Sequence, residues 1–471
     1  MIRSQDILDR AAEWQLRADV VEKDYILGWL LAGIAAHLET RTHWVFKGGT
    51  CIKKCYFETY RFSEDLDFSL APEAPYTDDA ILENLRIVAR LAGEMSGIEF
   101  PIDQIILNPS QNRQGQPTYQ GRIYYRGPLG ARNLSRVIFD LTRQEQIVDP
   151  PTPLTVFHPY GDAPEAAIVV GGYSLQELVA EKMRALYERT RPRDLYDVVY
   201  LLENRIDVLD LNRVREILRQ KCVAKQIPVP GVEQFVRKVN DDAELKAEWG
   251  NMLAHQLPSL PNVDDFIARF AGLIAWLDQP NFVPVETTLP YVTAAADEVA
   301  VAPPGIQYWG HGLPLETVRF AGANRLLLQF SYHGRERLVE PYSVRRVQST
   351  GNILLYAWEL ASQQIKAFKA HEMMGVRATD RAFTPRYHIE LNTQGSIGIP
   401  AVSSRPALGY ARPRASRPRA TSSFGPTYVI ECLYCHKHFR RKTYDTALNR
   451  HKTKDGWNCP GTVGYLVDTQ Y

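Results

Sequence analysis

The chain has 471 residues, of which 45% are hydrophobic and 23% charged, an ordinary composition for a globular protein of roughly two to four domains. No window reaches the roughly 18 apolar residues of a membrane span, and the N-terminus lacks the apolar segment of a signal peptide, so we expect a cytoplasmic protein that does not bind membranes. The net charge of +1 is uneven, because residues 396–471 carry 12 Lys/Arg against 4 Asp/Glu, and this basic end indicates a polyanionic partner.

Residues 1 to about 40 predict two helices, and the segment FKGGTCIKKCYFETYRFSEDLDF, residues 46–68, follows them. In an extended strand Asp65 and Asp67 share one face, with Cα atoms roughly 6.5–7 Å apart, within reach of a shared pair of Mg²⁺ or Mn²⁺ ions. The turn Gly48-Gly49-Thr50 would let the backbone approach a polyphosphate closely. Taken singly, a Gly-Gly turn and a solvated strand end are the simpler interpretations.

A helix is expected near residues 78–95, and short strands at 119–125 and 135–141. In the second strand Val137, Phe139 and Leu141 share one face and Asp140 lies on the other, near the strand end. Asp140 is therefore a candidate third metal ligand. A carboxylate that caps the next turn explains the same residue.

The helix that begins at Ser174 has a capping signal and an apolar stripe that includes Lys182. An inward lysine needs a buried acid or a cleft with an anion, although a lysine at the core edge can also extend to solvent. The next helix begins near Arg191 and places Asp194 in its first turn, where the helix dipole also favours an acid.

In the order KGGT, RFSEDLD, EKMRAL and RDLYD, these segments resemble the AbiEii/AbiGii-type nucleotidyltransferase toxins over roughly residues 5 to 280. The resemblance implies an α/β nucleotidyltransferase fold of the polymerase-beta type. It also implies roles for particular residues: a metal-bound aspartate at Asp140, a lysine that contacts the triphosphate at Lys182 and an active-centre acid at Asp194. With the residues named above, the expected site comprises Asp65, Asp67, Asp140, Lys182 and Asp194 as catalytic groups, and Gly48, Gly49, Thr50, Ser63 and Lys182 at the nucleotide.

Residues 281–305 are rich in Pro, Thr and Ala and predict a linker after a first domain at 1–280. Residues 306–395 predict a small β domain, with strands near 324–332, 337–344, 351–358 and 387–391. This part resembles a WYL domain, a β-barrel-like ligand-sensing module, without the Trp-Tyr-Leu triplet. Candidate ligand contacts are Tyr342, Arg345, Arg346 and Tyr356, which ordinary packing on the strand surface would also explain.

Residues 396–427 predict a flexible Arg/Pro/Ser-rich linker before a module at 428–471. The spacing of Cys432, Cys435, His451 and Cys459 predicts a structural Zn²⁺ site of CCHC type. His436 or His438 could replace the fourth ligand, and a redox C-x-x-C pair is the alternative. Basic residues alternate here with Tyr434, Phe439 and Trp457, which suggests binding to nucleic acid, although Phe439 could form the small core.

The resemblance implies transfer of a nucleotide from an NTP to an acceptor hydroxyl, with release of pyrophosphate. It further implies a toxin or phage-defence effector, with tRNA as the leading acceptor and a cognate antitoxin as a partner. Two alternatives remain at this point. One is a catalytically idle regulator that senses a ligand and binds DNA, and the other is an enzyme that modifies a protein hydroxyl.

Overall fold

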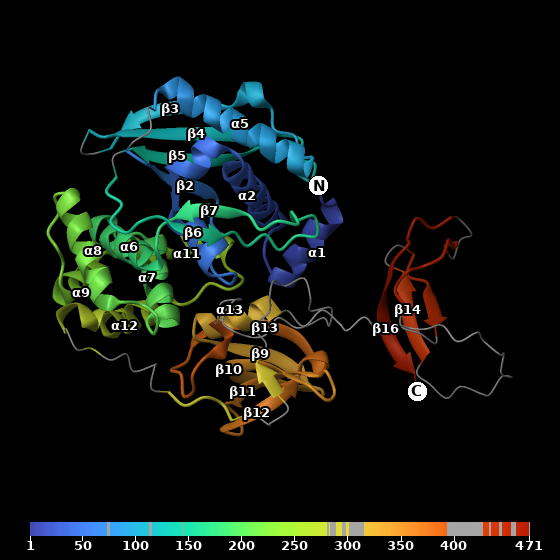
Figure 1. Ribbon diagram of the computed structural model, residues 1–471. Coiled ribbons are helices and arrows are strands. Elements are labelled where there is room, and N and C mark those ends of the chain that lie inside the picture. The colour runs from blue at the N-terminus through green and yellow to red at the C-terminus, as the bar shows by residue number, and fades with distance from the viewer. Residues whose placement is uncertain are drawn as a thin grey trace. The chain divides into compact units, whose positions relative to one another are not determined.

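The computed structural model describes residues 1–72, 76–112, 115–143, 145–279, 282, 289–293, 298–300, 315–392, 427–432, 435–441, 445–453 and 458–470. The chain forms two compact units, residues 1–399 and 400–471 (Figure 1). The linkers expected at 281–305 and 396–427 lie largely outside the described residues, so the domain boundaries there stay predictions.

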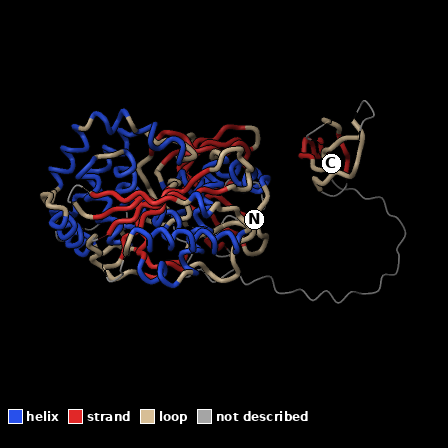
Figure 2. The backbone as a smooth tube through the Cα atoms, turned by 90° about the horizontal axis from the view of Figure 1, so that it is seen from above, coloured by secondary structure: helices blue, strands red, loops and turns tan. Residues whose placement is uncertain are grey.

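The first unit contains a mixed seven-stranded sheet in the order β3-β4-β5-β2-β1-β7-β6. Strand β2 runs parallel to β5 and β1 runs parallel to β7, while the other neighbours are antiparallel. The strands are β1 (Trp44–Lys47), β2 (Asp65–Leu70), β3 (Ile106–Gln111), β4 (Pro117–Tyr125), β5 (Ser135–Arg143), β6 (Thr152–Thr155) and β7 (Val169–Gly172). Seen from above, strands of the first unit lie among its helices (Figure 2).

Helices α2 (Ala18–Ala36) and α5 (Asp78–Ser96) pack together, and α5 covers the apolar face of β3 and β4. Gly121 of β4 permits this contact, because a Cβ there would lie 2.6 Å from the Leu85 side chain of α5. Helix α1 (Ser4–Trp14) packs on α2, and a short third helix, α3 (Leu38–His43), was not expected. The acidic residues of β2 and β5 therefore lie on the sheet face opposite α5.

A helical bundle follows β7 (Figure 1). It consists of α6 (Leu175–Arg189), α7 (Pro192–Arg205), α8 (Leu211–Ala224), α9 (Val232–Asp241), α10 (Ala243–Ala247), α11 (Trp249–Leu253) and α12 (Val263–Ile274). The capping signal at Ser174 is confirmed, since its hydroxyl accepts a hydrogen bond from the Glu177 N–H at 3.1 Å. Helix α7 is buried on nearly all sides, so its polar residues must find partners inside the protein. No helix in the described residues is long and apolar enough to cross a membrane.

The β-rich part of the first unit contains one α-helix, α13 (Leu315–Ala323), among its described residues. Its antiparallel sheet has the order β12-β11-β10-β9-β13, with β8 paired to β10. The strands are β8 (Glu298–Ala300), β9 (Leu326–Tyr332), β10 (Arg335–Val347), β11 (Ile353–Glu359), β12 (Gln364–Lys369) and β13 (Met373–Ala382). The register of β10 shifts at Pro341, which cannot donate a ladder hydrogen bond.

The strand expected at residues 387–391 is wrong. This segment ends in a short 3-10 turn at Glu390–Asn392, and the last strand of the sheet is β13. Its alternating apolar residues pack instead against α13, where Leu391 lies so close to Gly322 that a Cβ there would be 2.7 Å from it. The sequence pattern does not predict β13, because two register shifts interrupt the alternation of its residues.

The second unit is a three-stranded antiparallel sheet with the order β15-β14-β16. Its strands are β14 (Thr427–Cys432), β15 (His438–Arg441) and β16 (Gly464–Gln470). Ile430, Cys432 and Leu448 form its buried core among the described residues. Such a small core calls for an additional stabilising element.

Candidate active site and metal centre

One row of side chains crosses four strands of the first sheet. Asp67 of β2 pairs in register with Asp140 of β5 and with Lys47 of β1, and Asp140 pairs with Gln120 of β4. Residues that are directly opposite in neighbouring strands point to the same face, so the four polar groups form a continuous line. Gln120 Nε2 donates to Asp140 Oδ1 at 3.4 Å. Asp65 lies on the same face, two residues before Asp67, while Leu66 and Phe68 are fully buried on the other.

The glycines that follow β1 allow the chain to pass close to these acids. Gly48 has φ +79°, and a Cβ there would lie 2.1 Å from Asp67 Oδ2. At Gly49 a Cβ would lie 2.7 Å from Arg61 Nη2 and 3.1 Å from Ser63 Oγ. Both positions therefore need glycine for packing within the protein, whether or not a nucleotide is bound.

The hydroxyl of Thr50 donates to the backbone carbonyl of Asp65. It thus links the short helix α4 (Gly48–Cys51) to the start of β2 and helps to place the first aspartate. The structure brings Gly48, Gly49, Thr50 and Ser63 together beside the acids, as the motif predicts. Their contact with a nucleotide stays a prediction.

Burial raises the pKa of all three carboxyl groups. The pKa of Asp67 rises to about 6, because burial and the charges of Asp140 and Asp65 outweigh the opposing effects of Lys47 and Lys182. Burial is also the main cause of the raised pKa of Asp65 and of Asp140. A divalent cation would favour the ionised form of neighbouring buried carboxylates, because its positive charge offsets their mutual repulsion.

The three aspartates are less tightly gathered than a closed metal site. Within the described part of the chain, the Cys/His group discussed below is the only set of potential ligands whose atoms all lie within 4.8 Å of one another. The three aspartates therefore do not by themselves form a closed ligand set.

Lys47, which lies opposite Asp67 in the strand register, forms an ion pair with a carboxylate outside the row. Its ammonium group pairs with Glu145, which also accepts a hydrogen bond from Ser69 Oγ at 3.1 Å. Burial would raise the pKa of Glu145, but Lys47 holds it below its usual value. Lys47 thus supplies positive charge at the end of the acidic row. In the sequence, Lys47 is recognisable as the lysine that ends an apolar strand directly before Gly48 and Gly49.

Lys182 of α6 points to a buried acid, as its position on the apolar stripe predicts. That acid is Asp197 of α7, whose Oδ2 lies 2.6 Å from Lys182 Nζ. Arg61 also binds Asp197 through Nε at 2.6 Å and Nη2 at 2.8 Å, and the hydroxyl of Tyr60 donates to it. Burial alone would raise the pKa of Asp197, but Arg61 and Lys182 hold it well below its usual range.

Asp194, the acid predicted for the active centre, has a different partner. Both of its oxygens accept hydrogen bonds from Arg189, at 2.6 Å and 2.8 Å. The pattern Arg-Asp-x-x-Asp thus provides two buried acids, and the second one, Asp197, holds Lys182. Sequence reasoning missed Asp197 because it lies outside the apolar stripe of a helix that is buried on nearly all sides.

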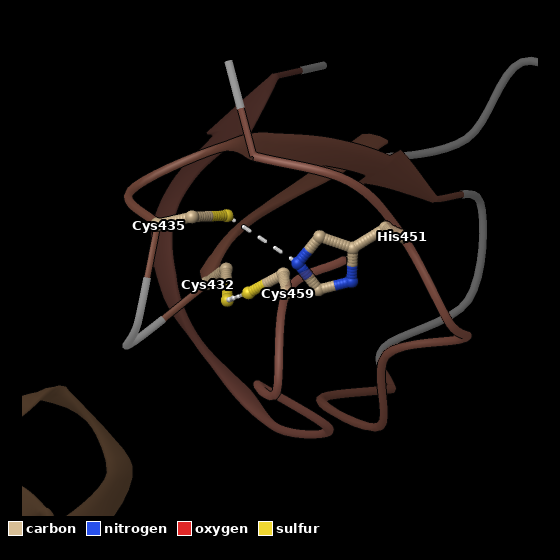
Figure 3. Close-up of side chains that lie close together, drawn as sticks. All are labelled: Cys432, Cys435, His451 and Cys459. Atoms are coloured by element: carbon tan, nitrogen blue, oxygen red, sulfur yellow. Dashed lines mark hydrogen bonds between the residues drawn. The ribbon is translucent and has the colours of Figure 1, made fainter. Parts of the chain in front are cut away.

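The second unit gathers Cys432, Cys435, His451 and Cys459 at one point (Figure 3). Cys432 Sγ lies 3.7 Å from Cys459 Sγ, and Cys435 Sγ lies 3.4 Å from His451 Nε2. All of these cysteines are free thiols, so the group is not a disulfide. Three thiol groups and one imidazole are the donor set of a tetrahedral structural zinc site.

The orientation of His451 fits this assignment. Its Nδ1 lies 2.9 Å from the carbonyl of Asn449, an arrangement that leaves Nε2 free to bind a metal. His436 and His438 instead contact Glu431 at 2.7 Å and 2.8 Å, so neither lies in the ligand group. Phe439 packs on the core and contacts the His451 ring edge-on, which favours its structural interpretation. Tyr434 and Trp457 lie outside the described residues.

The aspartate face should respond to pH. The raised pKa of Asp67 means that the folded protein binds its proton more tightly than the unfolded chain does, so stability falls as the pH rises from 3.8 through about 6. Asp67→Asn should therefore raise the melting temperature of metal-free protein above pH 6 and change it little below about pH 4. Mg²⁺ should then stabilise the wild type only. Equal melting temperatures at pH 8 would contradict the assignment, and the exposed Asp103→Asn is the control.

The purified full chain should contain a stoichiometric zinc ion, measurable by elemental analysis. Cys459→Ser and His451→Ala should each lose the zinc and make residues 428–471 sensitive to protease, because the small core needs the metal. His438→Ala is the matched control and should keep it. Zinc retained by His451→Ala but lost from His438→Ala would show that the wrong histidine has been assigned.

Comparison with known proteins supports the resemblance of the first unit. A family model described as "Nucleotidyl transferase AbiEii toxin, Type IV TA system" matches residues 29–270, within the range of about 5 to 280 expected from the motifs. No curated protein matches the chain.

Two solved structures show weak likeness. MenT4, a nucleotidyltransferase toxin from Mycobacterium tuberculosis H37Rv, is 23% identical, with a TM-score of 0.35, and the match covers 59% of this chain and 88% of that one. The proteasome accessory factor B/C of Arthrobacter aurescens is 10% identical, with a TM-score of 0.14 and coverage of 94% and 80%. At these scores neither structure adds to the argument. The family match, in contrast, spans just over half of the 471 residues, and the chain belongs to the AbiEii nucleotidyl transferase toxin family of type IV toxin–antitoxin systems.

Proposed function

We propose that this nucleotidyltransferase moves a nucleoside monophosphate from an NTP to a hydroxyl group of RNA, with Mg²⁺ or Mn²⁺ bound by Asp65, Asp67 and Asp140. Family membership already implies an NTP substrate and a cognate antitoxin. The observation that carries the proposal is the partly buried row of carboxylates on β2 and β5 between Lys47 and Gln120.

The cation would neutralise the triphosphate and activate the attacking hydroxyl. The chain's own residues prepare the site for it. Gly48 and Gly49 keep the backbone close to Asp67 and Arg61, so that Gly48, Gly49, Thr50 and Ser63 form the floor on which we place the nucleotide. Lys182 and Lys47 supply fixed positive charge that would stabilise the departing pyrophosphate without reorganisation.

Asp194 is retained in this proposal with a limited role. Arg189 occupies both of its oxygens, so Asp194 contributes negative charge and fixes the start of α7. Arg193, exposed beside it, is free to approach a phosphate. The acid that forms an ion pair with Lys182 is Asp197.

Three substitutions test the site. Asp65→Ala should lower transfer by several orders of magnitude, since it removes a metal ligand. Lys182→Ala should lower it by about 10²–10³, the scale of one lost transition-state donor, and should still fold because Arg61 remains on Asp197. Asp140→Asn should weaken activity and Mg²⁺ dependence without lowering the melting temperature, because burial already disfavours the ionised carboxylate.

The assay follows each labelled NTP into total RNA and, in parallel, into total protein. Asp103→Ala, an exposed acid of the same domain, is the control. Wild-type transfer by folded Asp65→Ala would refute the site. Label in protein and not in RNA would replace the acceptor that we propose with a protein hydroxyl.

An RNA acceptor is supported by the sheet surface beside the acids. Arg122 and Tyr124 follow Gln120 on the same face of β4, and Tyr124 pairs in register with Arg136 of β5. Arg136 is exposed and the other two are half-buried. Arginine and tyrosine bind phosphates and stack on bases, so this surface suits a single-stranded RNA end next to the transfer site. We place tRNA first among the acceptors, in a toxin or phage-defence role.

The second unit adds further positive charge. Lys437, Arg440, Arg450 and Lys452 are exposed around the zinc ligands, whereas Lys442 and Lys454 lie outside the described residues. We propose that this unit delivers the enzyme to RNA and performs no chemistry. In the alternative, it docks the antitoxin.

Arg122→Glu with Arg136→Glu should weaken RNA binding and reduce the log–log salt slope by about 1.5 units, since each lost phosphate contact contributes roughly 0.7–0.9. Deletion of residues 396–471 from the wild-type chain should also reduce the log–log salt slope. Both proteins should keep their affinity for NTP. Arg90→Glu, on the α5 side of the sheet, is the matched control. Unchanged affinity and slope after the deletion would favour the antitoxin-docking alternative.

For the β-rich part we keep the WYL-like, ligand-sensing assignment as a proposal. Its predicted ligand contacts are now fewer, because the hydroxyl of Tyr342 donates to Glu340 and Arg345 pairs with Glu390 at 2.6 Å inside the domain. Arg346 and the half-buried Tyr356 remain closer to the surface. An effect of this part on the enzyme would have to pass through its contacts with α1, α7 and the segment before β2.

A further inference from the structure

Four consecutive residues, Glu58 to Arg61, connect the β-rich part to the lysine of the active site. The first two contact α13. Glu58 Oε2 lies 3.2 Å from Arg319 Nη1, and Thr59 Oγ1 donates to Glu316 Oε2 at 3.0 Å. Glu316 and Arg319 are each 4% exposed, so water cannot readily replace these contacts.

The next two residues bind the active-site side. The Tyr60 hydroxyl and the Arg61 guanidinium both bind Asp197, and Asp197 in turn binds Lys182 at 2.6 Å. Tyr60 and Arg61 are each 3% exposed and Asp197 is fully buried. The backbone carbonyl of Thr59 also accepts a hydrogen bond from Tyr200 of α7, which ties this segment to the helix that carries Asp197.

The charged groups of this connection are buried and depend on one another. Burial raises the pKa of Glu316, while Lys53, Arg319 and Thr59 act to lower it. If Arg319 is removed, Glu58 and Glu316 lose a cationic partner inside the protein, and the segment has to move to expose or re-pair them. Because Glu58 to Arg61 are adjacent in the chain, a shift at Thr59 also shifts the residues that hold Asp197.

We propose that α13 is a positioning element for the nucleotidyltransfer site, in which Glu316 and Arg319 hold residues 58–61 and thereby set the position of Asp197 and Lys182. This inference rests on the proposed contact between Lys182 and the triphosphate. It makes the β-rich part a required component of the enzyme. Any ligand or partner that displaces α13 would lower the use of NTP without touching the aspartates.

Three variants test the link on the full chain: Thr59→Val, Glu316→Gln and Arg319→Met. Thr59→Val removes the hydrogen bond to Glu316, Arg319→Met removes the ion pair with Glu58, and Glu316→Gln removes the buried charge, each with little change in volume. We expect each to raise the KM for NTP by about tenfold, the scale of one lost hydrogen bond to a charged group. Arg319→Lys, which keeps the positive charge, should restore most of the loss. Gln15→Ala removes a contact of α1 with Val376 of the same β-rich part and should leave KM unchanged.

The decisive measurement combines each variant with Lys182→Ala. If α13 acts through Lys182, the double variant should have the same KM for NTP and the same transfer rate as Lys182→Ala alone. The reason is that the positioned group is already absent. Losses that multiply would show that the α13 variants act by another route and would overturn the inference. Thr59→Val, an isosteric change, gives this answer even if the charged variants fold poorly.

Failure of this inference can be told apart from failure of the proposed function. If Lys182→Ala lowers transfer and Thr59→Val, Glu316→Gln and Arg319→Met behave as wild type, the inference is wrong and the site stands. If Lys182→Ala itself transfers at the wild-type rate, the proposed role of Lys182 is wrong, and the inference falls with it.

Discussion

The geometry of the site depends on the ion pairs that the buried carboxylate of Asp197 forms with Arg61 and Lys182. This carboxylate is fully buried, and an ionised carboxylate in that position is tolerated only when cations and donors surround it. Arg61 and Lys182 meet this need from two different elements, the loop before β2 and helix α6. Because Arg61 lies four residues before Asp65, the same contact that holds the lysine also fixes where the acidic strand begins. One buried charge thus joins the two halves of the site.

At the three aspartates of β2 and β5, unlike at Asp197, nearby cations do not outweigh the effect of burial on the pKa. Asp65, Asp67 and Asp140 lie close to one another, and burial opposes their ionisation. An apolar or amide side chain would serve the fold better at these positions. Local rules are usually broken at functional sites, where the unfavourable contact is needed for chemistry. In the function that we propose, a bound cation and a triphosphate would relieve this repulsion and would stabilise the protein at these three aspartates.

The two accessory parts are stabilised by different means. The β-rich part shares a continuous apolar core with the helices of the first unit, and its helix α13 adds buried ion pairs at Glu58 and Glu316. The module at 428–471 has a core of only Ile430, Cys432 and Leu448 among its described residues. So few apolar contacts do not hold a fold, and a metal at the Cys/His group, which we predict, would supply the remaining stability.

The sequence by itself determined the features that depend on local spacing: the shared face of Asp65 and Asp67, the inward direction of Lys182, the cap at Ser174 and the members of the Cys/His group. Period and spacing follow from backbone geometry alone, so no distant contact is needed to read them. Only the tertiary structure decided that Asp140 and Lys47 flank Asp67 in one row, and that Lys182 is held by Asp197 and not by Asp194. It also replaced the expected strand at 387–391 with β13. Strand register and the pairing of buried charges are set by contacts between residues far apart in the chain, which no local pattern encodes.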